Sequence, residues 1–201
     1  MNFEIVLATN NKHKLQEVRQ ILSPHGIVVY GISDLNLKPE EAIEDGSTYA
    51  ENALIKAKVL QKVTSFPIIA DDSGIEIFAL NHQPGIHTAR FAQECGGHDK
   101  AIEYIIDRLK DQEDRRAQFV CDIVLLNVED KPLIFEGIAP GHIAYKSEGE
   151  HGFGYDPIFI PLGRDCVYAL MEEKEKNEIS HRARALKKLL TYLRVKGLIN
   201  K

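Results

Sequence analysis

Apolar and polar positions follow one another along the chain in blocks that predict alternating strands and helices. Continuous apolar runs favour strands at residues 3–8, 27–30, 68–71, 118–128 and 132–139. Apolar side chains at helical spacing favour helices over residues 15–22, 50–60, 102–109 and 180–193. We therefore expect an α/β fold with a mixed sheet, in which the last two apolar runs pair as antiparallel neighbours.

Two adjacent acids stand at the end of one predicted strand. The stretch IIADDSGIEI places Asp71 and Asp72 directly before Ser73 and Gly74. Successive side chains of a strand point to opposite faces, so the two acids can share one site only if the strand ends there, as Ser-Gly suggests. We therefore expect the strand to end at the two acids, at the edge of the sheet where α/β folds bind ligands. The alternative is an Asp-Ser-Gly turn between two strands, which gives no reason for the second acid.

Composition narrows the class of protein. With 201 residues, 44% of them hydrophobic and 27% charged, the chain is expected to bury a core over 1–201 as one domain or as two closely packed lobes. It has no apolar run of about 18 residues and no signal-type N-terminus, which predicts a cytoplasmic protein without a membrane partner. The cysteines Cys95, Cys121 and Cys166 form no C-x-x-C pair and indicate neither disulfides nor zinc.

The net charge of −5 gives no general attraction to nucleic acid, so an anionic ligand would need locally concentrated positive charge. ATNNKHK, residues 8–14, offers it where a strand hands over to a helix: free backbone N–H groups, two Asn amides and two lysines gather there. The Walker pattern is absent. A plain Asn-capped helix is the alternative, and on this segment alone it is the favoured one.

Three further features of the sequence could serve to bind the metal, the base or the phosphates of a nucleotide. Mg²⁺ is commonly held by one or two carboxylates together with phosphate oxygens, which suits adjacent acids at a strand end. In GFGYDP, residues 152–157, glycines bracket two aromatic rings that could stack on a base or equally belong to the core. In KNEISHRARAL, a helix capped by Ser180 would place His181 and Arg182 in its first turn, near a phosphate or a base.

Taken together, six segments resemble the inosine triphosphate pyrophosphatase family, which removes non-standard purine triphosphates such as (d)ITP and XTP. They are ATNNKHK, EDGSTYAENALIKA, IADDSGIEI, PGIHTARFA, GFGYDPIF and KNEISHRARAL, and the resemblance spans residues 6–193. It implies an elongated central mixed sheet with flanking helices, which form two lobes around a nucleotide-binding cleft, and usually a homodimer. The implied reaction is Mg²⁺-dependent hydrolysis to the monophosphate and pyrophosphate, with Mn²⁺ as a substitute metal.

The resemblance also implies roles for individual residues. Asp72 matches the general base and a metal ligand, Asp71 would help to organise metal or water, and Glu44 matches a second metal ligand. The expected substrate contacts are Thr9, Asn10, Asn11, Lys12, His13, Lys14, Lys56, Ser73, Phe153, Gly154, Tyr155, Asp156, Lys176, His181 and Arg182. Asn10 stands where the family commonly has glycine, and NHQPGI, residues 81–86, lacks the family's usual double glycine.

Two other functions compete with this one. A haloacid-dehalogenase-type phosphatase would use an aspartyl nucleophile in a D-x-D pattern after the first strand, whereas the acids here are adjacent and in the middle of the chain. A nucleotide sensor would bind the same ligand without turnover. DNA binding through the basic C-terminal helix is disfavoured by the acidic total charge. The sequence leaves open which of ITP, dITP and XTP is preferred, and which of Asp71 and Asp72 is the base.

Overall fold

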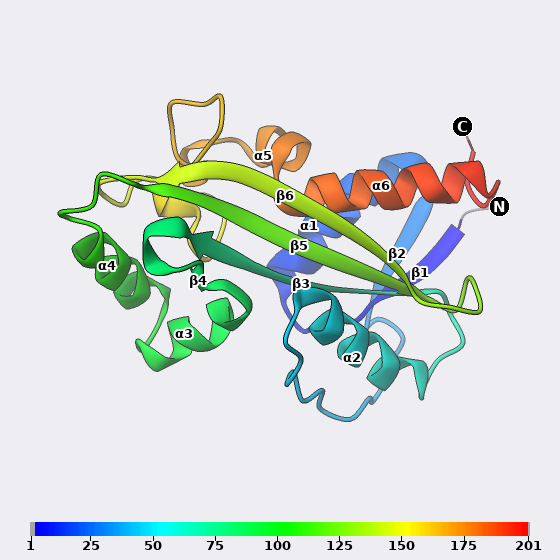
Figure 1. The fold of residues 1–201 in the computed structure, drawn as a ribbon. Coiled ribbons are helices and arrows are strands. Elements are labelled where there is room, and N and C mark those ends of the chain that lie inside the picture. The colour runs from blue at the N-terminus through cyan, green and yellow to red at the C-terminus, as the bar shows by residue number, and fades with distance from the viewer. Residues whose placement is uncertain (1–2, 201) are drawn as a thin grey trace. The chain divides into compact units, whose positions relative to one another are not determined.

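The structure, a computed structural model, describes residues 3–200 (Figure 1). In chain order its strands and α-helices are β1 (Phe3–Leu7), α1 (Lys12–Leu22), β2 (Ile27–Gly31), α2 (Tyr49–Gln61), β3 (Ile68–Ile77), β4 (Gln83–Pro84), α3 (Thr88–Glu94), α4 (His98–Arg108), β5 (Arg116–Leu126), β6 (Leu133–Ile143), β7 (Phe159–Pro161), α5 (Glu173–Ile179) and α6 (His181–Val195). Strands and α-helices alternate as expected from β1 to β3, whereas later in the chain strands follow strands and helices follow helices.

The strands form one mixed sheet in the order β2-β1-β3-β5-β6-β7, with β4 added beside β3. β1 runs parallel to both β2 and β3, whereas β4 is antiparallel to β3 and β7 is antiparallel to β6. The predicted α/β class with a mixed central sheet and flanking helices is therefore confirmed, as is the pairing of the two long apolar runs, which form β5 and β6.

The chain divides into two compact units. The first consists of the chain up to Asp72, Cys121–Gly137 and the chain from Arg182 on, and the second of Ser73–Val120 and Ile138–His181. Strands β3, β5 and β6 each contribute residues to both units. Within the described residues, none of the helices has both the length and the apolar character that a membrane span requires.

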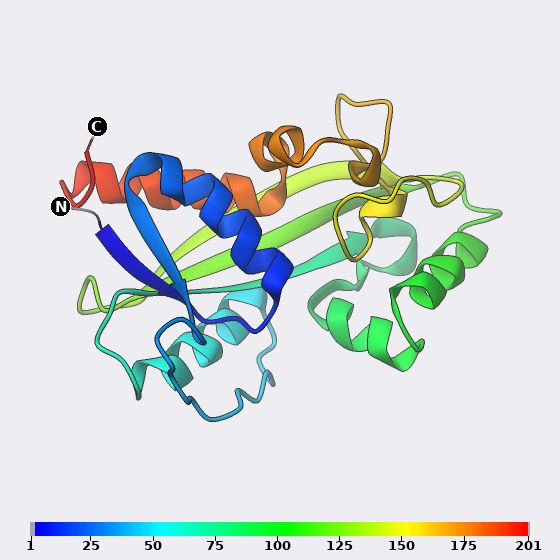
Figure 2. The ribbon, with the colours of Figure 1, turned by 180° about the vertical axis from the view of Figure 1, so that it is seen from behind.

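In the first unit, helices cover both faces of the parallel strands (Figure 2). Leu22 of α1 and Leu189 of α6 pack in one apolar cluster with Ile5 of β1. On the opposite face, Ala57 of α2 packs with Val6 of β1. The predicted amphipathic stripe of α6 is confirmed, because its leucines are buried: Leu186, Leu189, Leu190 and Leu193.

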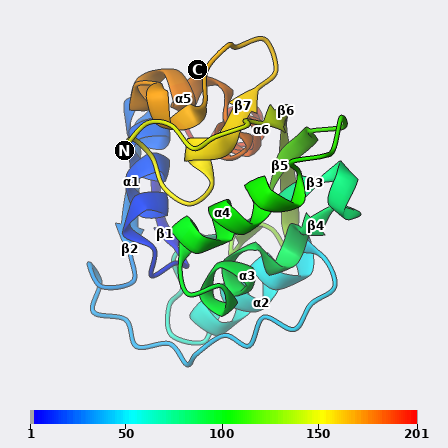
Figure 3. The same ribbon diagram turned by 90° about the vertical axis from the view of Figure 1, so that its left-hand side faces the viewer.

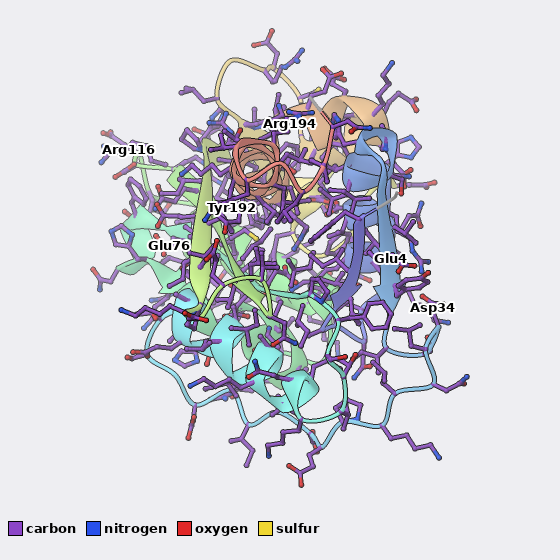
Figure 4. The ribbon with its side chains drawn as sticks, turned by 90° about the vertical axis from the view of Figure 1, so that its right-hand side faces the viewer. Glu4, Asp34, Glu76, Arg116, Tyr192 and Arg194 are labelled. Atoms are coloured by element: carbon purple, nitrogen blue, oxygen red, sulfur yellow. The ribbon has the colours of Figure 1, made fainter. Side chains whose placement is uncertain are left out.

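Polar contacts hold the edge of the first unit at β2. The Tyr30 hydroxyl donates to Glu4 Oε1 at 2.8 Å, and the Arg19 guanidinium pairs with Asp34 at 2.5 Å. Figure 4 labels Glu4 and Asp34, which both lie on this side of the unit. At the far end of α6, Tyr192, also labelled in Figure 4, donates to Glu129 at 2.5 Å. Of these contacts only that between Arg19 and Asp34 is an ion pair, and an exposed ion pair typically contributes below about 1 kcal/mol to stability.

In the second unit, α3 and α4 lie side by side (Figure 3), and the rings of Phe91 and Tyr104 meet edge to face at 5.6 Å.

The buried Arg115 links the end of α4 to the end of β6. Its guanidinium donates to the carbonyl oxygens of Leu109, Ile143 and Ala144 at 2.7, 2.8 and 2.7 Å. The buried guanidinium thus donates to three backbone carbonyl groups and also lies over the Tyr145 ring, 4.3 Å from its centroid, which fixes these chain segments to one another.

The expectation that a strand ends at the two acids is wrong. β3 continues through Ser73 and Gly74 to Ile77. Gly74 is required there for space and not for a turn, because a Cβ atom at that position would lie 2.1 Å from the Gly85 carbonyl oxygen. Since the strand is continuous, Asp71 and Asp72 point to opposite faces of the sheet. The side chain of Asp71 shares the face of α1 and α6, and that of Asp72 shares the face of α2.

Candidate active site

The turn between β1 and α1 is a capped helix start. The Asn11 side-chain oxygen accepts from the backbone N–H groups of His13 and Lys14 at 3.0 and 3.2 Å, and Thr9 Oγ1 accepts from the Asn11 N–H at 3.1 Å. Asn10 is exposed, as are the side chains that follow it up to His13. Asn11 is thus the N-cap of α1, as the capped-helix interpretation predicts. Lys14, at the end of this segment, forms an ion pair with Asp71.

Asp71 is the centre of a buried ion-pair network in the first unit. Its Oδ2 lies 3.0 Å from Lys14 Nζ, and it accepts from Arg182 Nη2 and Nε at 3.0 and 3.2 Å. Arg182 extends its other Nη to Glu17 Oε2 at 2.5 Å. Asp71 and Arg182 are each only 1% exposed. The first turn of α1 and the first turn of α6 are therefore joined through one strand residue.

The charges around Asp71 keep it ionised. Burial opposes ionisation, but the attraction of Lys14 and Arg182 holds the pKa of the Asp71 carboxyl far below its ordinary value. A carboxylate so strongly stabilised is a poor proton acceptor. Arg182, expected to meet a phosphate or a base, is occupied here by two carboxylates.

Glu17 was missed by sequence reasoning. It follows Lys14 by three residues on α1, which places both side chains on one face of the helix. That spacing, together with the inward-facing apolar stripe of α1, was the available signal.

Asp72 has a different environment, on the face of α2. Lys56 Nζ donates to its Oδ1 at 3.1 Å, and the Asn52 side-chain amide donates to its Oδ2 at 3.4 Å. Burial raises the pKa of Asp72 above its ordinary value, and Glu44 adds to the rise, although Lys56 opposes it. Of the two adjacent acids, Asp72 is thus the one suited to accept a proton.

Glu44 and Asp72 converge on one cation. Lys56 Nζ lies 3.0 Å from Glu44 Oε2 and 3.1 Å from Asp72 Oδ1, so the ammonium group bridges the two carboxylates. Over residues 3–200, no group of three or more His, Cys, Asp or Glu side chains is arranged to enclose a metal ion. Two carboxylates around a cation fit a Mg²⁺ ion that takes its other ligands from phosphate oxygens and water.

The sequence positions Asn52 and Lys56 through a well-defined helix start. Thr48 is the N-cap of α2, and its Oγ1 accepts from the Glu51 N–H at 3.1 Å. Asn52 and Lys56 are four residues apart and so lie on the same face of the helix, which meets Asp72. Sequence reasoning found Lys56 but missed Asn52, although this spacing was visible.

A second acid that was missed lies on β5. Asp122 is 8% exposed, and the Ala50 N–H in the first turn of α2 donates to its carboxylate. Its Oδ1 has no hydrogen-bond partner among the described residues. Burial, together with repulsion from Glu136, raises the pKa of Asp122 to about 6. An acid within an apolar run was the only signal in the sequence.

The second unit contains the remaining candidates around a buried ion pair. Lys176 Nζ lies 2.6 Å from Asp156 Oδ2, and the same oxygen accepts from the Phe153 N–H at 2.8 Å. The Lys176 ammonium also lies over the Phe153 ring, 4.7 Å from its centroid. Gly152 has a φ of 75°, and a Cβ atom there would lie 2.1 Å from Asp156 Oδ2. The glycine lets this segment wrap closely around the acid.

The aromatic candidates differ in burial. Tyr155 is 2% exposed, and its hydroxyl donates to the Thr88 carbonyl oxygen at 3.2 Å, so its ring belongs to the core. Phe153 is only half-buried and presents the ring that a base could reach. His181, 5% exposed, stacks on Phe119 with centroids 4.7 Å apart and an interplanar angle of 13°. Ser73 is half-buried on β3, and Gly154 has a φ of 66°.

This set of residues can be compared with known proteins. A sequence profile of the Ham1 family matches residues 5–192. The chain belongs to the Ham1 family. The predicted resemblance is confirmed, since curated relatives of this Ham1 chain are named dITP/XTP pyrophosphatase. One from Ruegeria pomeroyi is 42% identical over 191 residues, covering 92% of this chain and 93% of the relative. One from Photorhabdus laumondii is 42% identical over 195 residues, covering 95% and 98%.

Solved Ham1 structures share the fold. The Staphylococcus aureus Ham1 protein has a TM-score of 0.84 at 40% identity, covering 96% of this chain and 99% of the other. A HAM1 protein from Coxiella burnetii has a TM-score of 0.81 at 39% identity, covering 95% and 98%. The mixed sheet with flanking helices is therefore the Ham1 fold.

Proposed function

We propose that this chain hydrolyses the non-standard purine triphosphates ITP, dITP and XTP to the nucleoside monophosphate and pyrophosphate. The observation that carries the proposal is the convergence of Glu44 and Asp72 on one cation, Lys56, at 3.0 and 3.1 Å. Such a pair suits a metal-bound polyphosphate. The names of the curated relatives, dITP/XTP pyrophosphatase, support the choice of substrate class.

In the proposed reaction, a water molecule attacks the α-phosphorus, and Asp72 takes its proton. The new bond joins the water oxygen to the α-phosphorus, the bond from that phosphorus to the oxygen bridging it to the β-phosphorus breaks, and pyrophosphate leaves with the bonding electrons. The raised pKa of Asp72 suits it to the role of base. Asp71 takes no proton, because its ion pairs with Lys14 and Arg182 hold its pKa low although burial acts in the opposite direction.

The metal is proposed to be Mg²⁺, with Mn²⁺ as a substitute, held by Glu44, Asp72 and phosphate oxygens, and it would supply positive charge to the triphosphate. Lys56 occupies the position between the two acids in this structure. Its flexible stem allows the ammonium to exchange the carboxylates for phosphate oxygens when substrate binds. Lys14 and the exposed Asn10 to His13 segment are proposed to add further phosphate contacts.

Discrimination against ATP is proposed to come from donors that face a 6-oxo group. Lys176 and His181 are the candidate donors, and Phe153 is the candidate stacking surface. A 6-amino group would leave such donors unpaired, at a cost of about 1–3 kcal/mol per buried group. The roles of these second-unit residues rest on their chemistry and on the family resemblance.

The test is to incubate the pure protein with Mg²⁺ and ITP, XTP or ATP, and to assay pyrophosphate and orthophosphate separately. We expect pyrophosphate from ITP and XTP and hardly any from ATP. Equal turnover of ATP and ITP would contradict the proposed base discrimination. Orthophosphate as the released product would favour a phosphatase, and tight ITP binding without product would favour a sensor.

The homodimer stays a prediction. Size-exclusion chromatography with light scattering would measure the mass of the particle directly. A mass of 22.6 kDa, that of a single chain, would contradict the dimer.

A further inference from the structure

We propose that Asn52 is a positioning residue, which orients the Asp72 carboxylate and ties it to the segment that carries Glu44. The inference rests on the proposed function, because it concerns how the two acids are held for the reaction. It is carried by the burial of Asn52 and by the two hydrogen bonds of its side-chain amide.

Asn52 is only 4% exposed, although asparagine is a weak helix former that is seldom buried. The start of α2 does not need it as a cap. Thr48 Oγ1 already accepts from the Glu51 N–H at 3.1 Å, and Glu51 Oε2 accepts from the Ser47 N–H at 2.7 Å. The reason for a buried amide at this position must therefore lie in its other contacts.

Both ends of the Asn52 amide have partners. Its Oδ1 accepts from the Gly46 N–H at 2.9 Å, and its Nδ2 donates to Asp72 Oδ2 at 3.4 Å. The two ends are distinguishable, because the Gly46 N–H can only donate and an ionised carboxylate can only accept. An aspartate or a leucine of similar shape could not make both bonds.

The bond to Oδ2 determines which oxygen of Asp72 faces the second acid. With Oδ2 turned toward Asn52, the remaining oxygen, Oδ1, points to Lys56 and, through that ammonium, to Glu44. The partners of metal-binding and catalytic side chains fix their orientation in this way and affect activity about 10- to 100-fold. Asn52 thus sets the direction in which Asp72 presents its reactive oxygen.

The bond to Gly46 fixes the second acid, because Gly46 follows Glu44 by two residues. The segment lies directly on α2: a Cβ atom at Gly46 would be 2.8 Å from Asn52 Oδ1 and 2.7 Å from Glu51 Cβ. Only glycine permits so close an approach. One amide therefore connects the backbone beside Glu44 with the carboxylate of Asp72, and so sets the geometry of the pair.

Two variants at position 52 separate this role from a structural one. Asn52→Ala removes both bonds. Asn52→Asp keeps an oxygen for the Gly46 N–H but loses the donor to Asp72. If Asn52 only anchored Gly46, the Asp variant would keep wild-type kcat. We expect both variants to lower kcat about 10- to 100-fold with little change in KM. Gln61→Ala, which removes an exposed amide of the same helix, is the matched control and should keep wild-type kcat.

A second readout does not depend on turnover. Electron paramagnetic resonance would measure Mn²⁺ binding in the presence of an ITP analogue with a non-hydrolysable α–β link. We expect Mn²⁺ affinity to fall about tenfold in Asn52→Ala and to stay unchanged in Gln61→Ala. Circular dichroism and Tm would establish that each variant is folded, and Asn52→Asp carries the test if Asn52→Ala is not.

Wild-type kcat in either folded variant, or unchanged Mn²⁺ affinity in Asn52→Ala, would overturn the inference. A different outcome would count against the proposed function: no pyrophosphate from ITP with the wild-type protein. In that case the Mn²⁺ measurement would still decide whether Asn52 positions the two acids.

Discussion

Asp71 and Asp72 are neighbours on one strand, yet the two faces of β3 give their carboxyl groups opposite properties. Asp71, facing α1 and α6, meets the cations Lys14 and Arg182, and its pKa falls despite burial. Asp72, facing α2, meets Lys56 but also the acid Glu44, and burial raises its pKa. Burial of the carboxyl group is common to both. The difference therefore lies in the local balance of charge, which keeps one acid ionised and suits the other to accept a proton.

The largest effect that would sharpen this comparison is on catalysis. Asp72→Asn removes the proposed proton acceptor and one proposed metal ligand, and we expect kcat for ITP to fall about a thousandfold or more. Pyrophosphate release under saturating substrate would measure it. The fold should remain, because the asparagine can still contact Asn52 and Lys56. A loss of less than about tenfold would assign the role of base to another group.

The next largest expected effect is on the free energy of unfolding and concerns Asp71, on the other face of β3. Asp71→Asn leaves Arg182 buried with less compensating charge, and we expect it to lower the free energy of unfolding by about 3–5 kcal/mol. Urea denaturation would measure the change. Asp34→Asn, at the half-exposed pair with Arg19, is the matched control and should cost less than about 1 kcal/mol.

The pH dependence of the Asp71→Asn effect has a definite sign. Since the folded-state pKa of Asp71 is lowered from an ordinary value of 3.8, its stabilising contribution is fully present above that pH and is lost as the pH falls below it. The stability difference between wild type and variant should therefore shrink in strong acid. An equal difference at pH 7 and pH 2 would contradict the ion-pair explanation.

The smallest effect concerns Asp122, a buried acid whose pKa is raised mainly by burial and by Glu136, against a small opposing effect of Lys188. Its pKa is raised from 3.8 to about 6, so the folded state binds the proton more tightly and the chain loses stability as the pH rises through this range. Asp122→Asn removes the cost of ionisation. We expect it to stabilise the chain by about 1–2 kcal/mol at pH 8 and by less at pH 5.

Urea denaturation at the two pH values would measure the effect of Asp122→Asn. Glu136→Gln, which removes an exposed neighbouring charge, is a useful comparison because it should lower the pKa of Asp122 without changing its hydrogen bonds. A destabilisation by Asp122→Asn at pH 8 would mean that the charged contact to the Ala50 N–H outweighs the cost of burial.

Local patterns were sufficient to predict much of the fold. β1, α1, α2 and α6 have apolar runs or stripes whose period is a property of the segment itself, and each was placed from sequence. The short helices α3 and α5 were not predicted, because seven residues of mostly polar character leave little periodicity to detect. The continuity of β3 was missed because Ser73 and Gly74 resemble a turn, while the actual reason for Gly74 is a distant carbonyl group.

The residues of the candidate site also divide into those that local sequence patterns revealed and those that they did not. Lys14, Asp71 and Asp72 were found because they lie in recognisable segments. The partners Glu17, Asn52 and Asp122 were missed, because a polar residue's burial depends on segments far away in the sequence. Arg182 illustrates the limit: its place in the first turn of α6 was predicted, but its pairing with a strand residue 111 positions earlier was not.

That long separation has a consequence for the synthesis of the protein. During translation, Asp71 emerges long before Arg182, so the nascent chain carries this carboxylate without the buried guanidinium partner until α6 has been made. The first unit is assembled from three separate pieces of chain, the last of which begins at Arg182. We therefore expect ribosome-bound chains that stop before residue 181 to remain open to proteases in their first 72 residues, and to become resistant only when the C-terminal helix has left the ribosome.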